Sequence, residues 1–142
     1  MPFCHTRLRG RKQRNSKYPW KLDKLGDHIR KKRLELGLLQ KDLAGKIGVD
    51  QGTACRWETN ETSPPIRFIP KIVDFLGYNP LPAPKTFPEE LLAARRALGL
   101  TQRGMAKRLG VDPTTILLWE RGKRRPSKKL LPVVQSLLRR GT

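Results

Sequence analysis

The chain contains the same motif twice, at a constant offset of 62 residues. Residues 36–60 return as residues 98–122 without insertion or deletion, and eleven of the 25 positions are identical. The identical residues read Leu-Gly-Leu, Gln, Ala, Gly-Val-Asp, Thr and Trp-Glu, in that order. Self-similarity at a fixed spacing indicates a duplicated folding unit, here one whose internal geometry tolerates no change of length.

Each copy has the pattern of two short helices joined by a tight turn. In the second copy, Thr101 stands at an N-cap position before a short helix. One face of that helix has the i, i+3, i+4, i+7 spacing and consists of Gln102, Met105, Ala106 and Leu109. Gly110 ends the helix, and Asp112 is placed to cap the next one, with Pro113 at its first position. The first copy has Leu39 in place of the threonine, which removes a capping oxygen worth about 1 kcal/mol.

The flanking sequence predicts one helix before each copy and one after it. In the first module these helices cover about 23–36 and 69–76, and Pro70 and Pro132 fit the first turn of the two closing helices. The expected core residues are Leu25, Ile29, Ile69, Ile72 and Leu76 in the first module and Leu91, Leu130, Val134 and Leu138 in the second. We expect an all-α protein with an arm at 1–21, domains at 22–77 and 87–142, and a stiff proline-rich linker at 78–86.

These residues resemble the helix-turn-helix domain of the Cro and lambda-repressor type, also called the XRE family. In the first copy the resemblance is carried by Ile29, Arg33, Gly37, Leu38, Gln40, Leu43, Ala44, Ile47, Gly48, Val49, Thr53, Trp57 and Glu58. In the second it is carried by Leu91, Arg95, Gly99, Leu100, Gln102, Met105, Ala106, Leu109, Gly110, Val111, Thr115, Trp119, Glu120 and Gly122. It covers about 22–77 and 87–138, and it implies two tandem domains that bind double-stranded DNA and regulate transcription.

The net charge points independently to a polyanionic partner. The chain has 31 Lys and Arg against 12 Asp and Glu, a formal charge of +19, and neutralised phosphates supply most sequence-independent affinity for nucleic acid. Counting by segment gives +7 for residues 1–21, +2 for 22–78 and +10 for 79–142. The arm and the second copy therefore hold nearly all of the electrostatic attraction.

The resemblance implies that the second helix of each motif enters the major groove. Its reading positions are Gln51, Gly52, Cys55 and Arg56 in the first copy and Pro113, Thr114, Leu117 and Leu118 in the second. Gln51 can pair with adenine and Arg56 with guanine, or both can be solvated polar residues. The second copy can contact only thymine methyl groups or use the hydroxyls of Thr114 and Thr115. In the first copy, Thr53 is a further candidate contact. Leu117 and Leu118 can belong to the core, to a protein interface or to a methyl contact.

Phosphate contacts are expected beside the reading helices. The family uses the glutamine at Gln40 and Gln102 to contact phosphate and to brace the reading helix; capping or solvent exposure are the alternatives. The cations that follow the second reading helix are Lys123, Arg124, Arg125, Lys128 and Lys129. They match a family loop that lies along the backbone, although such a run can also be merely solvated. The matching loop in the first copy has Glu61 and no cation.

Two further pairs of positions are structural by resemblance. The family pairs the positions of Arg33 and Glu58, and of Arg95 and Glu120, as internal ion pairs. Both pairs are 25 residues apart. We interpret Trp57 and Trp119 as core residues rather than as platforms for stacked bases.

The arm is basic and poor in apolar residues, so we expect it to be disordered in isolation. Its cations are Arg7, Arg9, Arg11, Lys12, Arg14 and Lys17. They can insert into a narrow minor groove or attract phosphates diffusely. The family resemblance does not reach this segment.

Several classes of function are disfavoured. Cys4 and Cys55 are expected to be reduced, and with His5 and His28 they lack the spacing of a zinc site. We expect no cofactor, no small-molecule effector, no membrane segment and a cytoplasmic location. A nuclease or recombinase is disfavoured because no carboxylate cluster remains. Repressor domains of this type often dimerise through a fifth helix. Here Gly77 leads directly into the prolines of the linker, so we expect the covalent tandem to take the place of dimerisation. The alternative function is an antitoxin-like protein that docks a partner through Leu117 and Leu118.

Overall fold

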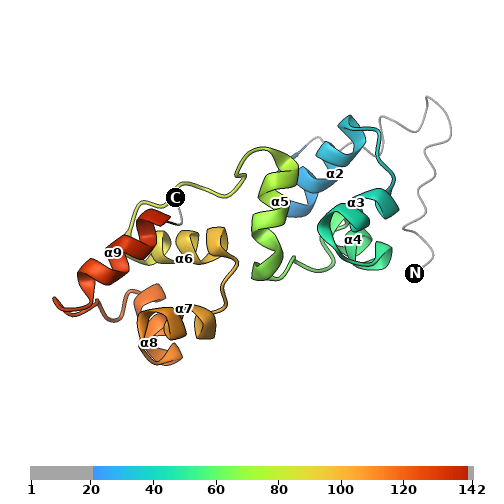
Figure 1. Ribbon diagram of the computed structural model, residues 1–142. Coiled ribbons are helices and arrows are strands. Elements are labelled where there is room, and N and C mark those ends of the chain that lie inside the picture. Colours follow the sequence, from blue (N-terminus) through green and yellow to red (C-terminus); the bar gives the residue numbers. More distant parts are fainter. Residues whose placement is uncertain (1–20, 141–142) are drawn as a thin grey trace. The chain divides into compact units, whose positions relative to one another are not determined.

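The computed structural model describes residues 21–140, and the regular secondary structure of this range is all helix, as the sequence predicts. The first repeat forms α2 (Leu25–Glu35), α3 (Gln40–Ile47) and α4 (Gln51–Glu58), followed by a 3₁₀ turn, η2 (Ile66–Phe68), and by α5 (Ile69–Leu76). The second repeat forms α6 (Phe87–Leu98), α7 (Gln102–Leu109), α8 (Pro113–Glu120) and α9 (Leu131–Arg140) (Figure 1).

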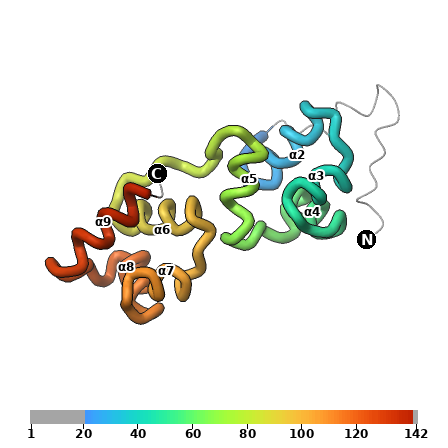
Figure 2. Tube along the Cα trace, in the orientation of Figure 1, coloured from blue at the N-terminus to red at the C-terminus, as the bar shows by residue number. Residues whose placement is uncertain are grey.

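The described residues divide into two compact units. One extends to Leu81 except for the short segment Pro65–Pro70, which groups with the other unit, and that other unit resumes at Pro82. Figure 2 traces the same succession of four helices twice along the chain. The helix starts keep the offset of the sequence repeat, as Gln40 and Gln102 or Ile69 and Leu131 illustrate.

Helix caps explain where the short helices begin. The hydroxyl of Thr101 accepts a hydrogen bond from the backbone N–H of Gly104 at 3.1 Å, and the carboxylate of Asp112 accepts one from Thr114 at 2.7 Å. Leu39 offers no such oxygen, but the carboxylate of Asp42 accepts a bond from the N–H of Leu39 at 2.9 Å. Asp42 therefore compensates in part for the missing threonine at the start of α3.

Each unit buries one helical core. In the first, the fully buried large side chains are Ile29, Leu43, Ile47, Ile72 and Leu76. In the second, the buried cluster is Leu91, Ala94, Met105, Ala106, Leu109, Ile116, Trp119, Val134 and Leu137. Leu25 is only half-buried, and Leu130 and Leu138 pack against the second core while partly exposed. The buried face of α9 runs through Leu137, which the sequence pattern did not single out.

A close helix contact in the first unit depends on the absence of a side chain. A Cβ on Gly26 of α2 would stand 1.9 Å from the carbonyl oxygen of Trp57 at the end of α4. Beside it, the amide of Asn60 donates to the carboxylate of Asp27 at 2.8 Å, and Asn60 has a left-handed φ of 59°. This contact holds the end of the reading helix directly against α2.

Candidate nucleic-acid interface

A buried ion pair fixes the reading helix α4 to the rest of its unit. The guanidinium of Arg33 donates from Nε to Oε1 of Glu58 at 2.5 Å and from a terminal nitrogen to Oε2 at 3.1 Å. Its other terminal nitrogen donates to the carbonyl of Leu38 at 2.9 Å. The two side chains are 5% and 2% exposed. A fork geometry of this kind sets orientation as well as attraction, so α2, α4 and the turn before α3 are held in one arrangement.

The glutamine at the start of α3 joins the same cluster. The amide nitrogen of Gln40 donates to Oε2 of Glu58 at 3.0 Å, so the side chain braces the reading helix. Its amide oxygen is buried without a hydrogen-bond partner in the described part of the chain. The amide nitrogen is thus already engaged, and contact between Gln40 and a phosphate stays a prediction.

The second unit repeats the cluster with more solvent access. Arg95 donates from Nε to Glu120 at 2.6 Å and from a terminal nitrogen to the carbonyl of Leu100 at 3.2 Å. Gln102 donates to the same Glu120 at 2.8 Å. The side chains of the ion pair are 12% and 10% exposed. The same three-residue brace therefore supports α8.

On α4, polar side chains form a chain that ends at the candidate guanine reader. The Thr53 hydroxyl donates to Asp50 at 2.6 Å and accepts from a terminal nitrogen of Arg56 at 3.3 Å. Hydrogen bonds from the hydroxyl and the backbone N–H of Thr53 lower the pKa of Asp50. Gln51, Thr53 and Arg56 are all half-exposed. Thr53 thus serves as a link that orients Arg56, in addition to any contact with DNA.

Cys55 does not belong to the exposed reading face. Its side chain is 3% exposed and it is disulfide-bonded, so the expectation that it is reduced is wrong, and it presents no thiol to a base. Spacing along the chain did not reveal this, because disulfide formation depends on the distance and direction of Cβ atoms in the fold. Cys4 lies outside the described residues.

On α8, the reading positions are mostly apolar. Thr114 is exposed, and Pro113, Thr115, Leu117 and Leu118 are half-buried. Neither leucine is part of the buried core or of the partly buried residues packed against it. The core interpretation of the two leucines is therefore removed, and a protein interface or a methyl contact remains. A backbone hydrogen bond from Thr114 lowers the pKa of Asp112, the cap of this helix.

The tryptophan of each repeat is buried in its unit. Trp57 and Trp119 are each 2% exposed. Their rings are therefore covered by protein and present no face to a base, which confirms the interpretation as core residues.

Backbone hydrogen bonds hold the basic loop that follows α8 against the end of that helix. The backbone N–H groups of Lys123 and Arg124 both donate to the carbonyl of Leu118, at 2.9 and 3.3 Å. The loop cations Lys123, Arg124, Arg125, Lys128 and Lys129 are all exposed, and none forms an ion pair within residues 21–140. In the first unit, Glu61 and Thr62 bond in the same way to the carbonyl of Arg56. The two loops share a backbone path and differ in charge.

A family model described as helix-turn-helix matches the chain twice, over residues 29–81 and 91–136. The chain belongs to this helix-turn-helix family, of the XRE type. Neither a search of curated proteins nor a search of solved structures found a match. The helix-turn-helix family binds double-stranded DNA and is not a family of enzymes.

Within 21–140, no helix of this helix-turn-helix protein is long and apolar enough to cross a membrane. The same range contains no group of three or more His, Cys, Asp or Glu side chains placed to hold a metal ion. The candidate arm residues Arg7, Arg9, Arg11, Lys12 and Arg14 lie outside the described residues.

Sequence reasoning missed two parts of this interface. One is the cap by Asp42, signalled by an acidic residue three positions after the N-cap residue Leu39. The other is the chain from Asp50 through Thr53 to Arg56, whose signal is the spacing of three between successive members on one helix. Both are local, and both were visible in the sequence.

Proposed function

We propose that the protein is a sequence-specific regulator of transcription whose two covalently linked helix-turn-helix modules bind neighbouring segments of one DNA site. The tandem takes the place of dimerisation, so the site need not be palindromic. The family match over both repeats and the formal charge of +19 support this proposal.

We propose further that the modules divide the work of binding. The observation that carries this proposal is the contrast between the two reading helices: Arg56 is half-exposed and oriented by Thr53, whereas Leu118 occupies the matching position of α8. A bidentate contact from arginine to guanine discriminates by about 1–3 kcal/mol. The exposed cations after α8, Lys123, Arg124 and Arg125 among them, instead contact phosphates and supply affinity without sequence preference.

Selection of bound sequences from a random pool of duplexes tests the first proposal. We expect an enriched motif that extends over two neighbouring major-groove segments, with a guanine at the position read by Arg56. An antitoxin-like interaction protein, in which Leu117 and Leu118 dock a partner and DNA binding is secondary, would return no motif. Both leucines are half-buried and lie outside the core, and this is the observation that favours the second function.

Paired affinities test the division of work. Arg56→Ala should weaken binding to the selected site by about 1–3 kcal/mol and change binding to random DNA little. The double change Arg124→Ala and Arg125→Ala should weaken both kinds of site by similar factors. Lys46→Ala, which removes an exposed cation from the last turn of α3, is the matched control for charge. If Arg56→Ala lowered both affinities equally, or if Leu117→Ala alone abolished sequence preference, the second module would be the reader.

A further inference from the structure

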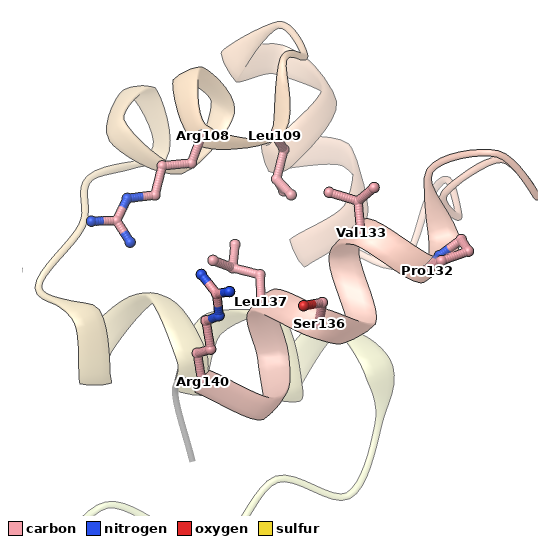
Figure 3. A pocket seen from close by; sticks show the side chains of 7 residues that line it. All are labelled: Arg108, Leu109, Pro132, Val133, Ser136, Leu137 and Arg140. Carbon is pink, nitrogen blue, oxygen red and sulfur yellow. The ribbon is translucent and has the colours of Figure 1, made fainter.

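A groove whose lining includes none of the candidate DNA-contact residues lies between α7 and α9 of the second unit. Its volume is about 610 Å³, within the range of about 300–1,000 Å³ that is typical of ligand pockets. Figure 3 shows Leu109 and Leu137 facing one another across it, with Val133 beside them. Leu109 and Leu137 are 6% and 8% exposed, and Val133 is 50% exposed. The groove thus has an aliphatic floor and one aliphatic wall that stands in solvent.

Two arginines stand at one end of this groove. Arg108 extends from α7 and Arg140 from α9, on the same side of the apolar residues (Figure 3). Both side chains are exposed, and neither forms an ion pair in the part of the chain that the structure describes. Guanidinium groups bind carboxylates with two parallel hydrogen bonds, so this end of the groove is suited to acidic groups.

The first unit has the same fold but carries different side chains at the positions that match this groove. Position 133 corresponds to Lys71, whose ammonium nitrogen lies 3.6 Å from the point where a Cβ on Gly48 would stand. In the second unit, nothing lies within 4 Å of the same point on Gly110. Arg140 corresponds to Tyr78, which hydrogen-bonds His28 at 2.8 Å. The exposed valine and the second arginine are therefore features of the second repeat and are not required by the fold.

We propose that this groove docks an acidic amphipathic segment of a partner protein, which places an aliphatic or aromatic side chain against Val133 and Leu137 and carboxylates against Arg108 and Arg140. Charge complementarity decides the occupant. Residues 79–142 carry +10, which disfavours a second copy of this chain. DNA offers phosphates to the arginines, but its sugar-phosphate backbone has no alkyl or aromatic side chain that could enter the groove beside Val133. An acidic peptide with an apolar anchor satisfies both halves of the groove.

The test uses the full chain and a phage-displayed library of random dodecapeptides. We expect the selection to enrich peptides that combine Leu, Ile or Phe with Asp or Glu. Binding of one enriched peptide, labelled with fluorescein, is then measured by fluorescence anisotropy. Val133→Lys introduces the residue that the first repeat carries, so it is compatible with the fold, and it should weaken the peptide about tenfold, which corresponds to about 1.4 kcal/mol. The double change Arg108→Glu and Arg140→Glu should weaken the peptide further.

Lys107→Glu is the matched control, because Lys107 is an exposed cation on the same helix that does not line the groove. It should leave peptide affinity within about twofold, as expected for a screened surface charge. The proposal is overturned if no peptide is enriched, if an oligoglutamate without apolar residues binds as tightly as the selected peptide, or if Val133→Lys has no effect. It is also overturned if the Arg108 and Arg140 changes weaken duplex DNA as much as the changes at Arg124 and Arg125 do, because the arginines would then be phosphate contacts.

Discussion

Replacement of Arg33 by alanine should destabilise the first unit by about 3–5 kcal/mol, the usual cost of removing one partner of a buried ion pair. Arg33 makes two hydrogen bonds to Glu58 and one to the carbonyl of Leu38. Without it, the Glu58 carboxylate keeps the amide of Gln40 while its side chain is only 2% exposed. In the second unit the partners are 12% and 10% exposed, so water can solvate Glu120, and Arg95→Ala should cost about 1–3 kcal/mol.

Urea unfolding measured by tryptophan fluorescence separates the two units, because each contains one buried tryptophan, Trp57 or Trp119. The changes Trp20→Phe and Trp119→Phe leave Trp57 as the reporter for the first unit. Within that background, the midpoint of unfolding is compared with and without Arg33→Ala. The corresponding background, with Trp57→Phe, reports on Arg95→Ala.

A double variant tests whether the unpaired carboxylate is the cause. Arg33→Met with Glu58→Leu removes both charges and keeps similar volume, and such replacements of buried pairs are often neutral or stabilising. We expect it to recover most of the stability lost in Arg33→Ala. The reasoning is refuted if Arg33→Ala leaves the unfolding midpoint unchanged while DNA affinity falls, since Arg33 would then contact DNA directly. It is also refuted if the double variant is no more stable than Arg33→Ala.

Three other predictions concern the arm, the helix caps and a close helix contact. Removal of residues 1–21 should flatten the slope of log affinity against log salt by about 0.9 per lost phosphate contact, and an unchanged slope would exclude the arm from the interface. Thr53 lowers the pKa of Asp50 from its ordinary value of 3.8. The helix cap therefore contributes its full stabilisation above pH 3.8, and this stabilisation is lost as the pH falls through the lower pKa of the folded state. The wild type should therefore lose stability relative to Asp50→Asn as the pH falls below about 3.8, as measured by urea unfolding, whereas a difference independent of pH would contradict this assignment. Gly26→Ala should cost about 1–3 kcal/mol, because its Cβ would stand 1.9 Å from the Trp57 oxygen. Gly45→Ala, with nothing within 4 Å of its Cβ, should stabilise α3 by up to about 1 kcal/mol, and equal effects at the two glycines would contradict the close contact.

The sequence by itself determined the fold class, the repeat and the starts of the short helices α7 and α8. Those features depend on local chemistry: Thr101 and Asp112 cap their helices through neighbouring backbone N–H groups, and the apolar spacing from Met105 to Leu109 specifies one helical face. Because caps and periodicity act over three to seven residues, they can be read without knowing how the helices pack. The same holds for the net charge, which is a sum over the chain.

The tertiary structure decided which side chains are available to a partner. For Leu117 and Leu118 the sequence left core, protein interface and methyl contact open, and the packing places both leucines outside the core. The hydrogen bond from the amide of Gln40 to Glu58, 18 residues away, gives this side chain a bracing role that no local pattern shows. The groove between α7 and α9 joins residues 108 and 140, which no local pattern connects. Burial and long-range contacts depend on how helices distant in sequence meet, and that arrangement is a property of the packed core rather than of any short segment.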